Sequence, residues 1–216
     1  MKSVLEKAFP TPLLYLRAWS ALFRKPTSYL RTTGWLDSLG ARRPLDPNGD
    51  PIPWMNYAVV RLLKERLTTD LTLFEYGSGY STEFFAARVA VVTSVEYDAE
   101  WVERIRSRMP GNATIVFREA DGDGEYCRAI HTVGQPLDVV VIDGRDRVNC
   151  LRQALGALTP RGVILFDDTH RERYRDAFAI AREAGFRALS LDGLKPTGNE
   201  ADETTIFYRD GNCLGL

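Results

Sequence analysis

From position 71 onward, short runs of apolar and β-branched residues alternate with longer stretches of mixed polarity. The short runs predict strands, and the longer stretches predict amphipathic helices. We expect seven strands, at residues 71–76, 91–97, 113–119, 137–143, 162–168, 186–192 and 204–210. We expect helices between them at residues 81–88, 99–109, 125–132, 147–158 and 171–184. Strands that alternate with helices are typical of βαβ units and a parallel sheet.

The last two predicted strands are joined by the polar segment GLKPTGNEA, which has no helical pattern. This connection favours an antiparallel hairpin, because a parallel pair needs a long crossover. The predicted fold is therefore α/β: a Rossmann-like, seven-stranded, mostly parallel sheet that ends in an antiparallel hairpin.

The N-terminal part has a different pattern. It starts with helical stretches that are rich in aromatic and basic residues. These are followed by the linker RRPLDPNGDPIPW, in which DPNGDP is a strong turn signal. A further helix is expected at residues 55–67. We therefore divide the chain into a helical extension, residues 1–66, and a Rossmann-like domain, residues 67–216. The extension could form a lid over the ligand-binding edge, with Trp54, Met55 and Tyr57 facing the substrate. Alternatively, these side chains only pack the extension on the domain.

The composition sets limits on this picture. The 216 residues suffice for one well-filled core, and 44% hydrophobic and 26% charged residues are ordinary for a globular protein. No apolar run approaches the ~18 residues of a membrane span, and no cleavage site follows the N-terminus convincingly, so we expect mature protein without a transmembrane segment. The chain has three cysteines, Cys127, Cys150 and Cys213, and none of them has C-x-x-C spacing. An odd number without that spacing argues against a disulfide framework and against a zinc site. A reducing compartment, the cytoplasm, is therefore expected.

Charge is distributed unevenly. Residues 1–66 contain eleven Lys and Arg against five Asp and Glu, a net +6, which leaves −7 for the remainder. The basic segment could contact anionic lipid, an acidic partner surface or a phosphate-bearing substrate, or could be a solvated helix surface. A peripheral membrane contact and a homodimer therefore stay open. Nucleic acid is not expected, because the whole chain is not basic and its aromatic residues do not follow a basic stripe.

The segment EYGSGYST at residues 75–82 follows the first predicted strand and opens a helix. It therefore lies at the carboxyl edge of the sheet, where open α/β folds bind ligands. Two glycines allow a tight turn, but a threonine replaces the third glycine of the dinucleotide fingerprint. The carboxylate before the glycines suits a cationic ligand rather than a pyrophosphate. The candidate cofactor-binding residues here are Glu75, Gly77, Ser78, Gly79, Ser81 and Thr82.

Two further strand ends offer nucleoside contacts. Glu96, nineteen positions after Gly77 and followed by Tyr97, ends the second strand, where an acidic side chain can accept hydrogen bonds from both ribose hydroxyls. Ala120 and Asp121 follow the third strand, where Asp121 could accept a hydrogen bond from an adenine amino group. A simple turn is the alternative for these two residues.

These segments, FEYGSGYSTEFFA, VTSVEYDAEW, VVVIDGRDRVNC and GVILFDDTHRERY, resemble class I S-adenosylmethionine-dependent methyltransferases. The resemblance is closest to a group of small bacterial FkbM-like enzymes. PIPWMNY and TTIFYRDGNCLGL resemble the same group, so the similarity runs from about residue 30 to the end. It implies an S-adenosylmethionine cofactor, whose sulfonium and ammonium groups suit Glu75. The terminal hairpin agrees, because it is expected of a methyltransferase sheet rather than of a dinucleotide dehydrogenase.

A second set of acidic residues ends neighbouring strands. Asp143 closes the fourth strand, and Asp167 and Asp168 close the fifth, so the three carboxylates meet at one edge. Such a set suits a hard cation such as Mg²⁺. It is similar to the metal ligands of catechol-type and macrolide-sugar O-methyltransferases, which implies transfer to a hydroxyl. The nearby Arg145 and Arg147 could instead pair with the carboxylates and leave no ion.

The candidate catalytic residues are Asp143, Arg145 and His170. Asp143 would be a metal ligand or a base, and His170 would be the natural base of a metal-free enzyme. His131, the only other histidine, is expected to be incidental.

Four arginines favour an acceptor that is anionic or linked to a nucleotide: Arg145, Arg147, Arg171 and Arg173. Exposed ion pairs are the other explanation for these side chains. With the family resemblance, the arginines suggest a small molecule or a sugar of a surface-glycan or secondary-metabolite pathway. The alternatives for the chain as a whole are a nicotinamide-dependent oxidoreductase and a non-catalytic partner subunit.

Overall fold

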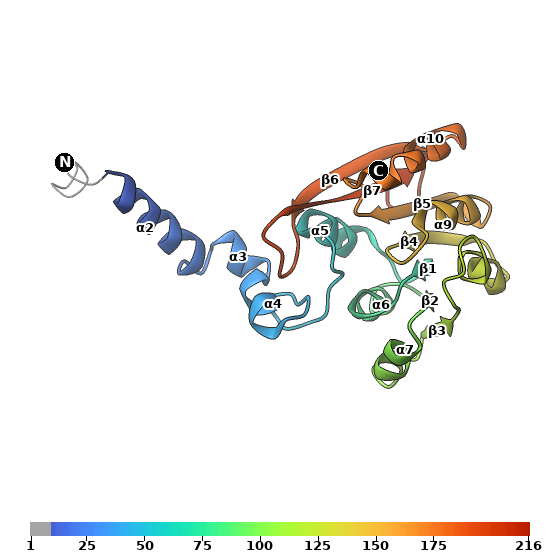
Figure 1. Cartoon of the computed structure of the whole chain (residues 1–216), viewed down its shortest axis with the longest axis horizontal. Coiled ribbons are helices and arrows are strands. Elements are labelled where there is room, and N and C mark those ends of the chain that lie inside the picture. The colour runs from blue at the N-terminus through green and yellow to red at the C-terminus, as the bar shows by residue number, and fades with distance from the viewer. Residues whose placement is uncertain (1–9) are drawn as a thin grey trace.

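The seven predicted strands form one sheet. A computed structural model describes residues 10–216, and the predicted extension before Pro10 lies outside the described residues. The strands are Thr72–Tyr76 (β1), Val91–Glu96 (β2), Ala113–Phe117 (β3), Leu137–Ile142 (β4), Leu158–Asp167 (β5), Arg187–Leu194 (β6) and Ala201–Tyr208 (β7). Their order is β3-β2-β1-β4-β5-β7-β6 (Figure 1). β1 to β5 are parallel, and β7 is antiparallel to β5 and β6, which confirms the predicted α/β sheet and its terminal hairpin.

The predicted helices are present with shorter bounds. They are Tyr80–Ala86 (α6), Ala99–Arg106 (α7), Glu125–Arg128 (α8), Arg147–Leu155 (α9) and Asp176–Glu183 (α10). Short 3₁₀ turns at Ala129–Val133 and Glu172–Tyr174 complete two of the predicted helical stretches. β5 begins at Leu158, earlier than predicted, because Leu158 pairs with Leu137 at the start of β4. The loop between β6 and β7 is likewise shorter than GLKPTGNEA, because Leu194 still pairs with Ala201.

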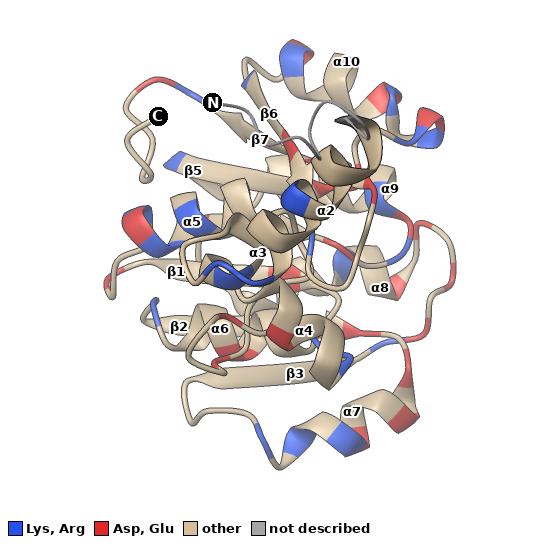
Figure 2. Ribbon diagram, turned by 90° about the vertical axis from the view of Figure 1, so that its left-hand side faces the viewer, with Lys and Arg blue, Asp and Glu red and all other residues tan. Residues whose placement is uncertain are grey.

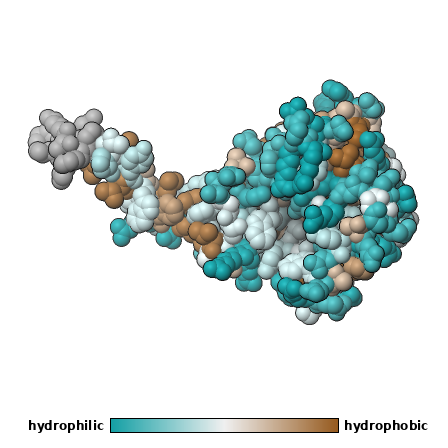
Figure 3. Space-filling model, in the orientation of Figure 1, coloured by the Kyte–Doolittle hydropathy of each residue, from teal (hydrophilic) through white to brown (hydrophobic). Residues whose placement is uncertain are grey.

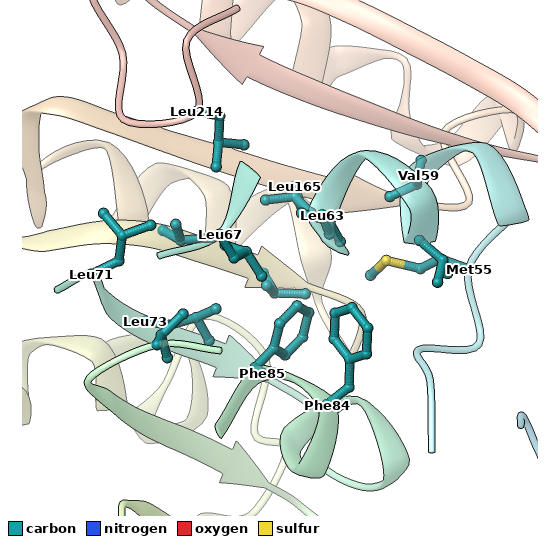
Figure 4. Packing of buried hydrophobic residues seen from close by; sticks show 14 of the residues in the cluster. Met55, Val59, Leu63, Leu67, Leu71, Leu73, Phe84, Phe85, Leu165 and Leu214 are labelled. Carbon is teal, nitrogen blue, oxygen red and sulfur yellow. The ribbon is translucent and has the colours of Figure 1, made fainter. Parts of the chain in front are cut away.

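The strands bury both faces of the sheet. In β1, Leu73 lies in the hydrophobic cluster on one face, and the next residue, Phe74, lies in the cluster on the other. This alternation follows from the two-residue period of a strand. α8, α9 and α10 cover the Phe74 face. The Leu73 face is covered by α6 and by α5 (Tyr57–Arg66), whose Val59 and Leu63 have no exposed surface (Figure 4).

The described part of the extension, from Pro10 onward, begins with a helix that projects from the body of the protein (Figure 1). This helix, α2 (Pro10–Phe23), is followed by α3 (Tyr29–Thr32) and α4 (Trp35–Ala41) (Figure 1). Figure 2 views the protein from the side to which α2 projects, and Figure 3 shows hydrophobic surface along it. We call α2 the arm. None of the helices described between residues 10 and 216 is long and apolar enough to cross a membrane.

Two indoles and one amide tie the rest of the extension to the β6–β7 hairpin. Trp35 Nε1 donates to Gly198 O at 2.8 Å, and Trp54 Nε1 donates to Pro196 O at 2.8 Å. Asn56 caps α5 by accepting from Val59 N at 3.1 Å, and its Nδ2 donates to Leu191 O at 2.9 Å. The extension therefore stands beside the carboxyl edge of the sheet.

The lid prediction needs correction at two of its three residues. Met55 has no exposed surface and Tyr57 is 5% exposed, since both pack in the hydrophobic core instead of facing a substrate. Trp54 alone stays at the surface, where it is 42% exposed.

Candidate functional site

The first glycine of the EYGSGYST segment lets two loops approach each other. Gly77 has φ +94°, in the left-handed region that disfavours other residues. A Cβ at Gly77 would also lie 3.2 Å from the carbonyl oxygen of Asp143. The loops after β1 and β4 are therefore in contact, and the cofactor motif lies beside Asp143.

Glu75 is a buried carboxyl group at the end of β1. It is 1% exposed, and its oxygens accept hydrogen bonds from Ser81 Oγ and, at 2.6 Å, from Thr82 Oγ1. Burial raises the pKa of Glu75 to about 8, although these hydroxyl donors oppose the shift. Thr82 Oγ1 also accepts a hydrogen bond from Gly79 N at 3.0 Å. Thr82, which replaces the third glycine of the dinucleotide fingerprint, therefore stabilises the glycine turn.

Glu96 orders the other side of the turn. Its Oε2 accepts from Ser78 N at 3.0 Å, and its Oε1 accepts from Tyr97 N at 2.8 Å and Asp98 N at 3.0 Å. Trp101 Nε1 donates to Ser78 O at 2.8 Å from the first turns of α7. Sequence reasoning missed Trp101 as a site residue, although its place after VEYDAE is a signal that could have found it.

These groups line a cavity of about 250 Å³. Of the predicted cofactor residues, Glu75, Gly77, Ser78, Ser81, Glu96, Tyr97 and Asp143 line it, together with Asp98, Trp101 and Gly144. The predicted residues that do not line it are Gly79, Thr82, Ala120 and Asp121, of which the last two are exposed. Asp121 Oδ2 instead accepts from Glu125 N at 2.9 Å, which is the turn that we named as its alternative. Their contact with adenine stays a prediction.

The three strand-end aspartates surround a guanidinium group. Arg147 is buried, and its Nη2 lies 2.8 Å from Asp143 Oδ1 and 3.1 Å from Asp168 Oδ2. Its Nη1 donates to Asp167 O at 2.6 Å, and its Nε donates to Gly144 O at 3.0 Å. One side chain thus connects the ends of β4 and β5.

The residues do not fit a magnesium ion well as they are arranged. Asp143, Asp167 and Asp168 each offer an oxygen, and these oxygens lie within 4.8 Å of one another. However, Arg147 binds two of the three carboxylates, and Thr204 Oγ1 donates to Asp167 Oδ1 at 2.5 Å. An ion would have to displace these donors. The geometry favours the charge network, which is the alternative that we weighed against the metal.

A second group of charges adjoins this network. Asp202, at the start of β7, is 2% exposed and lies 3.3 Å from Lys195 Nζ and 3.6 Å from His170 Nδ1. Lys195 also lies 3.8 Å from Asp168 Oδ1. Burial raises the pKa of Asp143, Asp167 and Asp202. Sequence reasoning found His170 but missed Lys195 and Asp202, because both belong to the hairpin, whose register could not be read from the chain.

A larger cavity of about 460 Å³ adjoins the first and shares Tyr97, Asp143 and Gly144 with it. The four predicted arginines, Arg145, Arg147, Arg171 and Arg173, all line it. Arg145 lies over the ring of Tyr97 and Arg173 over the ring of Tyr174. Within residues 10–216, neither of these two arginines forms an ion pair with a carboxylate, whereas Arg171 lies 2.9 Å from Asp168 Oδ2.

Comparisons with known proteins agree on the fold. No family model and no curated protein matches this sequence. An rRNA methylase from Streptococcus thermophilus is similar with a TM-score of 0.53 and 16% identity, covering 71% of this chain and 95% of that one. A methyltransferase-like protein from Silicibacter pomeroyi has a TM-score of 0.52 and 23% identity, covering 73% and 89%.

A precorrin 8W decarboxylase from Methanobacterium thermoautotrophicum has a TM-score of 0.54 and 19% identity, covering 78% and 97%. The chain has the class I methyltransferase fold, and its chemistry has to be argued from its own site.

Replacing Glu75 with Gln should make stability less dependent on pH. The pKa of Glu75 is about 8 in the fold against an ordinary value of 4.5, so the buried group favours its neutral form. Its stabilising contribution is complete below the ordinary value and is lost as pH rises through about 8. In denaturant unfolding, E75Q should therefore gain stability relative to wild type between about pH 5 and about pH 9. The exposed Glu183→Gln change should show no such trend, and a parallel pH dependence of E75Q and wild type would contradict the assignment.

The wild-type protein should bind no divalent cation at the three aspartates, because Arg147 already forms ion pairs with two of them. Mn²⁺ is a suitable probe, since bound ion loses its free-ion electron paramagnetic resonance signal. We expect the signal to be undiminished by wild-type protein. Binding that disappears in Asp168→Asn would show that an ion displaces the guanidinium and would restore the magnesium hypothesis.

Proposed function

We propose that the protein is an S-adenosylmethionine-dependent methyltransferase that transfers the methyl group to a hydroxyl of an anionic small molecule or sugar. The observation that carries this proposal is the cavity in which Glu75 and Glu96 flank the Gly77 turn at the carboxyl edge of the sheet. A buried carboxyl suits the cationic end of the cofactor, and Glu96 suits its ribose hydroxyls. A pyrophosphate would be repelled by the Glu96 carboxylate and would meet no Lys or Arg among the residues that line this cavity.

The cofactor supplies an already activated methyl group on its sulfonium. The chain therefore has to hold the two reactants in line and remove the hydroxyl proton, and alignment alone can lower the barrier by several kcal/mol. The 460 Å³ cavity lies next to the cofactor cavity and shares Asp143 with it. An acceptor in the larger cavity would face the methyl group across Asp143.

Two arginines indicate the charge of the acceptor. Arg145 and Arg173 are held over tyrosine rings, which leaves their N–H groups to bind a ligand. Guanidinium groups bind carboxylates and phosphates with paired hydrogen bonds. We infer that the acceptor carries such a group, as a sugar phosphate, a nucleotide-linked sugar or a hydroxy acid does.

His170 is the base that we favour. Its Nδ1 lies 3.6 Å from Oδ1 of the buried Asp202, a neighbour that can orient the ring. His170 lines neither cavity, but it directly precedes Arg171, which lines the larger one, and its ring is 44% exposed, so an acceptor that extends past Arg171 would meet its other nitrogen. Asp143 is less available, because its Oδ1 is held by Arg147.

Cofactor binding gives the direct test. S-adenosylhomocysteine should raise the melting temperature, and NAD should not. Glu96→Ala should weaken the binding of S-adenosylhomocysteine about tenfold or more in calorimetry, because a charged hydrogen-bond acceptor is lost. Glu100→Ala on the exposed side of α7 should leave the affinity unchanged. Stabilisation by NAD alone would favour the oxidoreductase, and failure to bind either ligand would favour a non-catalytic partner.

The base can be tested once a screen of phosphorylated and carboxylated hydroxy compounds yields an acceptor. His170→Ala should lower kcat by about 10²-fold or more, the usual contribution of a general base, with unchanged affinity for S-adenosylhomocysteine. His131→Ala is the matched control, since His131 bonds to Gln153 away from both cavities. Wild-type kcat in His170→Ala would transfer the role to Asp143.

A further inference from the structure

We propose that the arm is a docking element for the surface of an anionic lipid bilayer. The arm, α2, exposes five large apolar side chains that the other described residues, 24–216, leave uncovered (Figure 3). They are Leu14 at 65%, Tyr15 at 71%, Leu16 at 64%, Trp19 at 53% and Leu22 at 47%. Single exposed apolar residues are common, but a contiguous group on one short helix marks an interaction surface.

The distribution of these residues around the helix favours lipid over a protein partner. Leu14 and Leu16 lie about 200° apart at 3.6 residues per turn, so they are on opposite sides of α2. A helix that packs on one partner surface covers a single stripe of about 100°. Acyl chains and headgroups can surround most of a helix, whereas one docked protein surface leaves either Leu14 or Leu16 in water.

The charge next to the arm matches an anionic surface. Residues 10–43 contain six basic residues and a single acidic one, Asp37. The six are Arg17, Arg24, Lys25, Arg31, Arg42 and Arg43. Arg24 and Lys25 directly follow the arm and are exposed, and Figure 2 shows basic residues on α2 and around α3. Trp19 and Tyr15 are also the residue types that concentrate where acyl chains meet headgroups.

The length of the arm indicates how it would lie. Fourteen residues of α-helix extend about 21 Å, which is shorter than the ~30 Å hydrocarbon core, so the arm would rest in one leaflet. Phe23 at its end contacts Trp35, and Trp35 is bonded to Gly198 of the β6–β7 loop. Docking would therefore hold the carboxyl edge of the sheet close to the lipid surface.

Vesicle sedimentation of the full chain tests the proposal. We expect binding to equimolar phosphatidylcholine and phosphatidylglycerol, little binding to phosphatidylcholine alone, and release by salt. Arg24→Gln with Lys25→Gln should lower the partition coefficient about 30-fold. Trp19→Ser with Leu22→Ser should abolish binding. The matched controls are Arg104→Gln with Arg106→Gln on α7 and Leu39→Ser on α4, where the leucine is 46% exposed.

The outcomes separate lipid from other partners. Equal sedimentation with neutral and anionic vesicles, no sedimentation with either, or unchanged binding of the Arg24/Lys25 and Trp19/Leu22 variants would overturn the proposal. A dimer in lipid-free solution that the Trp19 and Leu22 variant converts to monomer would assign the arm to a second copy of the chain. The stabilisation by S-adenosylhomocysteine should be the same in every variant, so a failure here is distinguishable from a failure of the proposed function.

Discussion

The carboxyl edge of the sheet depends on one buried cation. The guanidinium of Arg147 binds the carbonyl oxygens of Gly144 and Asp167 and the side chains of Asp143 and Asp168. Without it, the carboxylates of Asp143 and Asp168 would each lose an ion pair, and an uncompensated buried charge is strongly destabilising. The loops after β4 and β5 keep their relative position through this side chain, and both ligand cavities include residues of the β4 loop.

This arrangement separates two kinds of positive charge. Arg147 has its donors committed to the protein and therefore fixes the shape of the site. Arg145 and Arg173 line the same cavity, yet each is held by an aromatic ring instead of a carboxylate. An anionic ligand can therefore bind there without breaking an internal ion pair. The sequence alone did not distinguish these roles, because all the arginines stand in similar polar segments.

Most of the fold could be predicted from the local pattern of apolar and polar residues. Seven apolar runs, the helices between them and a polar final connection were sufficient to predict the sheet, and the EYGSGYST segment was sufficient to place the cofactor motif at its carboxyl edge. The predictions failed where a contact joins distant residues. Asp202 meets His170 through hairpin register, and Met55 and Tyr57 face the core because of how α5 turns on the sheet. Cys127 and Cys150, distant in sequence, likewise have their sulfur atoms 3.6 Å apart.

The hydrogen bonds from the indole N–H groups of Trp35 and Trp54 mean that the extension is not a separable module. They fasten the extension to the same hairpin that carries Lys195 and Asp202, while α5 fills one face of the core. Residues 35–66 are thus joined to the carboxyl edge of the sheet by hydrogen bonds and by core packing. A fragment cut at position 67, or a chimera with another protein's leader, would therefore lose part of the scaffold of the candidate site together with the apparent appendage.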